Sequence, residues 1–498
     1  MTTFAGPRFF TSSPDGKPGT FLASVCALCI IAVIILQTLS PDNSAITLAV
    51  ATILLSGFTA IWRFRRHGLD PLGLFSFAFC VYDGVLLFRL ATISDSSALV
   101  YPTTFNNQTY SAAGAMCTIA AATILVSAFV CESIVKRHDP SSHSVVASSA
   151  SSFGWFWTGL VVYAVGLVLY FLQFQQLGGY LASLAMDRGD RFELAGQAEL
   201  LSYPYLAFVV PGIAALFYGA ESGSSSGRRT VCYGLLLLWC VLVLLQGDRR
   251  LALQALLTSA AVLSMTRPAA LRFKFRTWLL LVAAYIAFSV FGHTRVFITL
   301  LASGQSNVSD VATEISDSVS TDSLTPEHSE FAGPYLSLLS AISEHTQSLY
   351  GSSYYESFLT VLPRFLYPGV KPRVLAEIFA AGVHRGSGTA SGWGYNPVAE
   401  AYINFGVFGI AVAFVLWTLF FLAVGALRGR GIGGTLLYAV LLSEAISANR
   451  IDFRNVYCET FYFVAVLCIA GIMASVMKKL VKHSVRISLP DNNSFSCA

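Results

Sequence analysis

The sequence predicts an all-α protein that crosses a membrane many times. Of its 498 residues, 55% are hydrophobic and only 12% are charged, about half the charged share of an ordinary soluble domain. A soluble fold of this size needs more charged residues to cover its surface. The apolar residues also gather in blocks of roughly 16–25 residues, the length of helix that crosses a hydrocarbon layer about 30 Å thick.

Taken in order along the chain, these blocks predict twelve membrane-spanning helices. The first block is too long for the core of a signal peptide and lacks an obvious cleavage site, so we expect it to be retained. The other boundaries follow the edges of the apolar blocks. The twelve expected spans cover residues 20–39, 45–62, 72–92, 109–134, 153–174, 200–219, 230–246, 251–266, 277–297, 397–424, 435–447 and 456–476.

This arrangement divides the chain into four parts. Residues 1–297 hold the first nine helices, 298–396 form one large loop before the tenth helix, 397–476 hold the last three helices, and 477–498 form a tail. Short basic connections set the orientation, because Lys and Arg are retained on the cytoplasmic side. With the N-terminus in the cytoplasm, 19 of the 31 Lys and Arg residues lie inside. The inner basic segments are "RFRR", "VKR", "GRR", "RPAALRFKFR", "RGR" and the tail "KKLVK".

The outer side carries a second pattern, in which arginine almost entirely replaces lysine. Ten of its eleven basic residues are arginine, whereas six of the nineteen inner ones are lysine. Arginine is favoured where a planar fork grips a phosphate or carboxylate. The clustering predicts a shared pocket for an anion, although each arginine can instead pair with a nearby aspartate. The eleven residues are Arg188, Arg191, Arg249, Arg250, Arg295, Arg364, Lys371, Arg373, Arg385, Arg450 and Arg454.

The turn "GDRR" holds the most informative of these arginines, Arg249 and Arg250. It joins two short expected spans, 230–246 and 251–266, so we expect it to lie below the outer surface. An arginine at membrane depth costs about 2.5–3.5 kcal/mol on insertion scales. Two adjacent arginines at this depth predict a compensating anion or a wet cavity.

The large outer loop has two unlike halves. Residues 303–345 contain seven acidic residues and no Lys or Arg, and we expect a solvated lid without chemistry there. From residue 357 onward the loop is basic, aromatic and punctuated by proline and glycine. This half predicts a small anion-binding roof over a membrane cavity, with "LAEIFAAGV" as an amphipathic helix at the interface.

Three titratable residues are candidates for chemistry. Asp83 lies near the middle of the third expected span and is either functional or part of a structural ion pair with Arg89. Glu400 begins the tenth span, where it can act as a general base, position a hydroxyl, cap a helix or hold an arginine. His384 stands beside Arg385 in a Gly/Ser-rich segment and is the best-placed histidine for proton transfer, although a lone loop histidine is more often incidental.

The sequence lacks the signatures of several other chemistries. It contains no recognised metal-ligand spacing, nucleotide-binding glycine loop or nucleophile elbow. Neither ATP hydrolysis nor nucleic-acid binding is indicated. These motifs indicate no cofactor.

Several of these features together resemble a known family. They are the many spans, the outer "GDRR" hairpin, the loop segment "LPRFLYPGVKPR", and "SGWGYNPVAEAYINFGVFGI" at the start of the tenth helix. In combination they resemble the O-antigen (oligosaccharide repeat-unit) polymerases called Wzy, which are related to the O-antigen ligases. The resemblance covers roughly residues 180–455, and "GWGYNPVAEAYINFG" is its most telling part.

The resemblance implies a GT-C-like glycosyltransferase at the periplasmic face of the bacterial inner membrane. Its donor is a glycan on undecaprenyl diphosphate, and a second lipid-linked repeat unit supplies the acceptor hydroxyl. Preorganised arginines would stabilise the departing diphosphate without a metal. The implied partners are the undecaprenyl-diphosphate-linked oligosaccharide, the lipid bilayer, a Wzz-type chain-length regulator and a Wzx-type flippase.

These arguments together select the residues of the expected site. The ligase relatives have a loop histidine near the place of His384, for which a role as base is proposed. We expect aromatic rings to stack on sugar faces, or only to form an interfacial belt. The expected catalytic residues are Glu400, His384, Arg249 and Arg250. The expected substrate-binding residues are Arg188, Arg191, Arg295, Arg364, Arg373, Arg385, Arg450, Tyr402 and Trp393.

Two other functions remain open at this stage. An O-antigen ligase would transfer the glycan to lipid A-core instead of to a second repeat unit. A flippase or exporter of lipid-linked glycans would favour inverted repeats and helices unwound at the membrane midplane. The sequence shows no convincing internal repeat, and the basic residues of interest crowd one face.

Overall fold

The structure is a computed structural model in which every regular element of the described residues is a helix. Two of the expected spans, 20–39 and 277–297, lie outside the described residues, as does much of the 298–396 loop. The described ranges are 44–92, 105–134, 149–175, 177–186, 204–223, 225–267, 332–344, 349–362 and 394–488, with residues 367, 375, 376, 378 and 379.

The helices follow the apolar blocks closely. Ten of the expected spans coincide with described helices, counting α3, η1 and α4 as one continuous rod. The elements are α2 (Ser44–His67), α3 (Pro71–Phe79), the π-helical η1 (Cys80–Val85), α4 (Leu86–Thr92), α5 (Asn107–Ile134), α6 (Ser149–Gln175), α7 (Tyr180–Ala185), α9 (Pro204–Glu221), α10 (Ser226–Leu245), α11 (Arg249–Thr266), α14 (Ala332–Ser343), α15 (Ser352–Leu359), α17 (Pro397–Ala426), α18 (Gly431–Ser447) and α19 (Phe453–Ser488).

Seven helical segments of the described chain are long and apolar enough to cross a membrane. Shorter apolar helices, Tyr205–Glu221 within α9 and Gly431–Ser447, accompany them. Large apolar side chains such as Leu237 and Phe408 are exposed on the outer faces of the bundle, as expected for surfaces that contact lipid. The chain therefore has the features of a polytopic helical membrane protein, whereas the total of about twelve helices and the GT-C class stay predictions.

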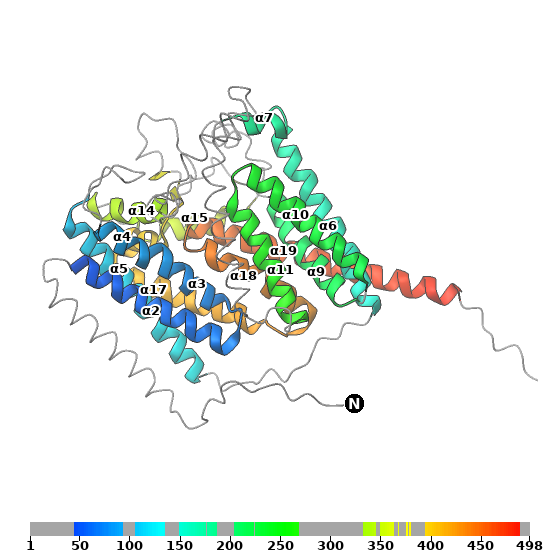
Figure 1. Cartoon of the computed structure of the whole chain (residues 1–498), viewed down its shortest axis with the longest axis horizontal. Coiled ribbons are helices and arrows are strands. Elements are labelled where there is room, and N and C mark those ends of the chain that lie inside the picture. The colour runs from blue at the N-terminus through cyan, green and yellow to red at the C-terminus, as the bar shows by residue number, and fades with distance from the viewer. Residues whose placement is uncertain are drawn as a thin grey trace, which may run out of the picture.

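The helices form two groups with a pair between them (Figure 1). The first group contains α2, the α3–η1–α4 rod, α5 and α17, and the second contains α6, α9, α10 and α11. Helices α18 and α19 contact both groups, and α19 extends well beyond the bundle (Figure 1). This central position matters because Glu444 of α18 and Glu459 of α19 both contact α11 of the second group.

Glycines bring α6 and α9 into close contact within the second group. Gly159 and Gly166 of α6 face α9, while Gly212 and Gly219 of α9 face α6. A methyl group added at Gly219 would lie only 2.3 Å from the backbone nitrogen of Phe156. Small residues that let backbones approach are a common means of packing helices inside membranes, where the hydrophobic effect contributes little between them.

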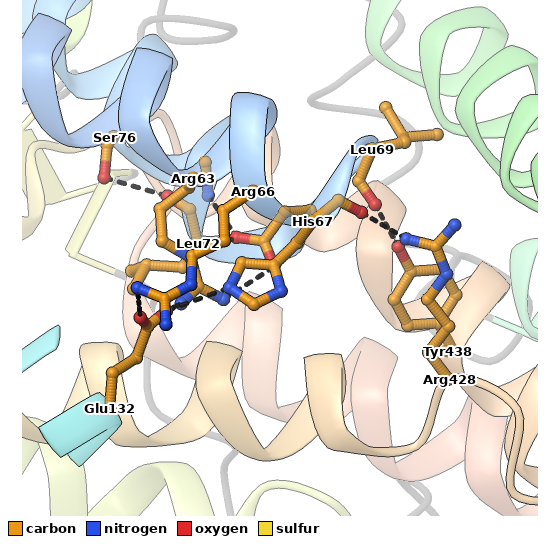
Figure 2. Close-up of polar contacts among 11 residues, drawn as sticks. Arg63, Arg66, His67, Leu69, Leu72, Ser76, Glu132, Arg428 and Tyr438 are labelled. Atoms are coloured by element: carbon orange, nitrogen blue, oxygen red, sulfur yellow. Dashed lines mark hydrogen bonds and ion pairs between the residues drawn. The ribbon is translucent and has the colours of Figure 1, made fainter. Parts of the chain in front are cut away.

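An ion network joins helix ends in the first group, as Figure 2 shows. The buried Arg63 at the end of α2 donates to both carboxylate oxygens of Asp70, at 2.9 and 2.8 Å, and also contacts Glu132 near the end of α5. Arg66 and His67 complete the network through Glu132, at 2.7 and 2.9 Å. Arginines of the segment "RFRR" contact Glu132, and Glu132 lies just before the segment "VKR". Two of the expected inner connections therefore lie at the same end of the bundle.

Two further contacts connect the α17–α18 side to this end. Arg428, in the connection after α17, donates to the backbone carbonyl of His67, and the Tyr438 hydroxyl donates to the carbonyl of Leu69 (Figure 2). Asp70 also caps α3 by accepting from the backbone N–H of Gly73 at 2.8 Å. The end of α2 and the turn after it are thus connected by polar contacts to α3, α5, α18 and the connection after α17.

Candidate functional site

The segment "GYNPVAEAYINFG", residues 394–406, enters the core through a tight backbone turn. Gly394 has a φ of +73°, and a side chain there would lie 2.3 Å from the carbonyl oxygen of Arg450. That same oxygen accepts a hydrogen bond from the backbone N–H of Tyr395 at 2.7 Å. Only glycine suits this position, because it combines a left-handed backbone with close backbone approach.

Asn396 then starts helix α17 and anchors it to the α3–η1–α4 rod. Its side-chain oxygen accepts from the backbone N–H of Val398 at 2.7 Å, which caps the helix, and Pro397 occupies the first turn, where a missing N–H costs nothing. The amide nitrogen of Asn396 donates to the carboxyl group of Asp83 at 2.7 Å. Asp83 is fully buried in the π-helical stretch η1, a feature often found at functional sites.

Glu400 lies one turn into α17 and is almost completely buried, with 2% of its surface exposed. One carboxylate oxygen accepts from the hydroxyl of Ser353 in α15 at 3.1 Å. The other accepts from the backbone N–H of Phe453, the first residue of α19, at 2.7 Å. Asn404 supports this arrangement by donating to Ser353 at 2.8 Å. Glu400 therefore joins three helices at their ends.

Two phenols close to Glu400 are held in their neutral form. Burial, followed by the charge of Glu400, raises the pKa of Tyr354 well above its usual value. The same two causes, with a contribution from Asp452, raise the pKa of Tyr395. Both groups therefore remain hydrogen-bonding phenols across the physiological pH range, and neither is suited to act as a base.

Helix α17 is interrupted directly after this segment. Phe405 and Gly406 have non-helical backbone angles, with a φ of +66° and a ψ of −158° at Gly406. The carbonyl of Ile403 near the break accepts from the backbone N–H of Leu349 at 2.7 Å. The expected single span 397–424 is therefore two helices, a short buried one and a longer one over residues 407–426. The longer part covers about 30 Å, enough to cross the hydrocarbon layer alone.

The "GDRR" turn forms a second polar centre. Gly247 adopts a φ of +81° and ends α10, and Arg249 and Arg250 begin α11. The turn is held against α7, because the side chain of Gln246 donates to the Ser183 hydroxyl at 2.8 Å. The two arginines therefore stand at a helix N-terminus, which itself favours anions.

The Arg250 guanidinium is bound by Glu459 of α19 in a two-point salt bridge, with distances of 3.0 and 2.8 Å. Gln254, one turn further along α11, donates from one amide nitrogen to Glu459 at 3.1 Å and to Glu444 of α18 at 2.7 Å. The Glu459 side chain is 4% exposed, whereas that of Arg250 is 26% exposed. The Arg250 side chain is thus partly accessible, whereas its carboxylate partner is buried.

The two polar centres meet on α19. Glu400 binds the first residue of that helix, Phe453, and Glu459 lies six residues further along, about 9 Å along the helix axis. Asp452 precedes Phe453 and accepts from the backbone N–H of Asn455 at 3.2 Å. The start of α19 therefore contacts both the expected acid, Glu400, and the expected arginine, Arg250.

The structure describes five of the thirteen residues expected at the site. Glu400, Arg249 and Arg250 have the positions given above, Arg450 supplies its backbone carbonyl to Tyr395, and Tyr402 is half-buried in α17. The other eight residues lie outside the described ranges and stay predictions. They are His384, Arg188, Arg191, Arg295, Arg364, Arg373, Arg385 and Trp393.

Four residues at these centres, Gln254, Asn396, Glu444 and Glu459, were not expected from the sequence. Glu444 and Glu459 are acids within apolar helices, a signal that by itself marks a residue as a functional candidate. Gln254 and Asn396 carry no such signal, because an amide near a helix end is common. Within the described ranges, no group of three or more His, Cys, Asp and Glu residues is arranged to hold a metal ion.

Comparison with known proteins gives one match. Residues 383–480 match the family model of the O-antigen polysaccharide polymerase Wzy. The resemblance inferred from the sequence is thereby confirmed over this range, which contains Glu400, Glu444 and Glu459. Neither the curated proteins nor the solved structures contain a significant match to the chain.

Proposed function

We propose that the protein is a glycosyltransferase that polymerises undecaprenyl-diphosphate-linked oligosaccharide repeat units at the periplasmic face of the bacterial inner membrane. The observation that carries the proposal is the match of residues 383–480 to the Wzy polymerase family. The matched segment includes three buried acids of the two polar centres, Glu400, Glu444 and Glu459. The product would be O-antigen or a similar surface polysaccharide.

The proposed reaction transfers a glycan from one lipid carrier to another. A hydroxyl of the acceptor repeat unit forms a bond to the anomeric carbon of the donor glycan, and the bond from that carbon to the diphosphate breaks. Negative charge then grows on the departing undecaprenyl diphosphate. Arg249 and Arg250, at the N-terminus of α11, would stabilise this charge without a metal ion.

The salt bridge of Arg250 leaves room for such an anion. A guanidinium has five N–H donors, and Glu459 accepts from two of its nitrogens, one hydrogen bond each. Three N–H groups therefore remain on a side chain that is 26% exposed. We propose that Glu459 orients the Arg250 guanidinium and that a phosphate oxygen accepts from its remaining N–H groups. The outer arginines that lie beyond the described ranges would extend this pocket.

The proton of the acceptor hydroxyl requires a base or an orienting group, for which Glu400 and His384 remain the two candidates. Glu400 already accepts two hydrogen bonds and is buried, so its role as base requires the Ser353 contact to be exchanged for the acceptor hydroxyl. As an orienting residue it requires no such change. Tyr402 and Trp393 are proposed to contact sugar rings.

The broken helix α17 is the one described feature that also suits a transporter. In transporters, however, such breaks lie near the membrane midplane. Here the break follows residue 404 and leaves a segment long enough to span the membrane, residues 407–426. The break therefore lies at the end of a span, where it positions the short helix that carries Glu400.

The decisive experiment is reconstitution of the full-length protein in liposomes with a synthetic polyprenyl-diphosphate oligosaccharide. We expect a ladder of lengthened lipid-linked glycans, unchanged by a metal chelator and without any flippase or chain-length regulator present. Movement of the substrate between leaflets without lengthening would instead indicate a transporter. Transfer to lipid A-core, with no transfer to a second repeat unit, would indicate a ligase.

A further inference from the structure

A group of buried polar side chains, Gln254, Glu444, Ser447 and Glu459, lies beside Arg250 and contains two carboxyl groups. Glu444 is fully buried, and Gln254 and Glu459 are nearly so. The amide nitrogen of Gln254 donates to both carboxylates, at 2.7 Å to Glu444 and 3.1 Å to Glu459. The second carboxylate oxygen of Glu444 and the amide oxygen of Gln254 are buried without a hydrogen-bond partner.

The charges in this group do not balance. Within the described residues, the charged groups that act on Glu444 are Glu459 from α19 and Arg250 from α11, and Arg250 also faces the phenol of Tyr205 from α9. Both carboxylates therefore face the guanidinium of Arg250, and Glu459 takes both of its hydrogen bonds. A buried carboxylate without its own cation is strongly unfavourable, and it is commonly neutralised by a proton.

We propose that Glu444 and Glu459 form a buried proton-binding site whose occupancy is coupled to anion binding at Arg250. Glu444 is the acid that takes up this proton when the anion binds, because in the free protein Glu459 is the carboxylate that Arg250 binds. This proposal rests on the proposed function, because that function identifies the anion as a polyprenyl diphosphate. It assigns to these acids a role in substrate binding that the family match does not provide.

The coupling follows from the arrangement of the charges. Arg250 is partly exposed, so an anion can reach its side chain while the two carboxyl groups stay buried. The added negative charge offsets the positive charge of Arg250, and Glu444 then binds a proton more tightly. Because such coupling is reciprocal, binding of the anion takes up a proton, and affinity for the anion falls as pH rises.

The test measures proton uptake when the full-length protein in detergent binds farnesyl diphosphate. Calorimetric titrations at about pH 8, above the second phosphate pKa near 6, are run in two buffers that differ in ionisation enthalpy. We expect uptake of up to one proton per bound anion, and a dissociation constant that rises by up to about tenfold per pH unit. Glu444→Gln should retain binding and lose the uptake, whereas Glu344→Gln, at an exposed position, should behave like wild type.

A second measurement uses the wild-type protein without any need for a variant to fold. Infrared difference spectra on adding farnesyl diphosphate should show a change in the carbonyl band of a protonated carboxylic acid, and that band should shift in D2O. Binding without proton uptake, or no binding by a protein that still polymerises, would overturn the proposal and leave the proposed function intact. A reconstituted protein that never lengthens its substrate would count against the polymerase assignment alone, because proton-coupled binding is measured independently.

Discussion

The side-chain amide of Asn396 donates a hydrogen bond to the carboxyl group of Asp83 at 2.7 Å, although 313 residues separate the two in the chain. Asp83 lies outside the range that matches the polymerase family, and Asn396 lies inside it. Because Asp83 accepts from the amide nitrogen, the amide oxygen of Asn396 faces the N–H groups at the start of α17. The α3–η1–α4 rod, through Asp83, therefore helps to fix the orientation of the short helix that carries Glu400.

Replacing Asp83 by alanine should destabilise the protein and reduce polymerisation. The change leaves the amide nitrogen of Asn396 buried without an acceptor, which costs about 1–3 kcal/mol, and frees the cap of α17. Asp83→Asn retains an acceptor oxygen and should lose less. Thermal unfolding in detergent measures the difference. Phe77→Ala, on the exposed face of the same rod, is the matched control and should change activity little; an equal loss in both variants would contradict the role of Asp83.

The helical framework was largely predictable from the sequence, because hydrophobic blocks of span length are local signals. The break at Phe405 and Gly406 was not, since an isolated glycine in a helical pattern is usually tolerated without a change of direction. The partners of Arg250 could not be predicted from the sequence either. Glu459 lies 209 residues away from it. No local sequence pattern indicates which of several candidate arginines an acid in a distant helix will bind.

Two variants of Glu400 separate its structural role from a catalytic one. In Glu400→Gln the amide oxygen can accept from the Phe453 N–H, and the amide nitrogen can donate to the Ser353 hydroxyl, so the fold should be retained. Glu400→Ala removes both contacts and should lower stability by about 1–3 kcal/mol. If Glu400 is the base, the Gln variant will be stable and inactive in the reconstituted assay. A Gln variant with wild-type chain lengths, together with an inactive His384→Ala, would assign proton transfer to His384.

Substitution of either arginine of the "GDRR" turn should nearly abolish polymerisation. Arg250→Ala also leaves Glu459 buried without its cation, which is expected to destabilise the protein by about 3–5 kcal/mol. Arg249→Ala should remain inserted in the membrane and inactive. Lysine at either position should rescue poorly, because it lacks the planar fork. Chain length in cells and protein level in membranes are the two readouts, and wild-type chains in both alanine variants would remove these residues from the site.

The ion network at the C-terminal end of α2, around Arg63, should contribute to stability without affecting the reaction directly. Arg63→Ala leaves Asp70 and Glu132 without a shared cation in a buried place, at an expected cost of about 3–5 kcal/mol. Arg65→Ala, two residues away and exposed, is the control and should cost less than about 0.5 kcal/mol. Unfolding temperature should fall only in the first variant, while the polymerisation rate per folded molecule should be equal in both.

Three glycine-to-alanine variants should rank in an order that the backbone sets. At Gly394 the added methyl group meets the Arg450 carbonyl oxygen at 2.3 Å as well as a left-handed φ, so this variant should be the least stable. At Gly406 nothing lies within 4 Å, and only the backbone strain remains, about 1–3 kcal/mol. Gly433, inside α18, also has nothing within 4 Å and no positive φ. Alanine there should stabilise the helix by about 0.4–1 kcal/mol.

The same ranking tests whether the break in α17 matters for activity. Because Gly406 separates the short helix of Glu400 from the spanning segment, its alanine variant should lose polymerisation more than its loss of stability explains. Activity measured per folded molecule, at a temperature well below the unfolding midpoint of every variant, makes this comparison. If Gly406→Ala and Gly433→Ala polymerised equally, the break would be a packing feature of the bundle and would have no part in placing Glu400.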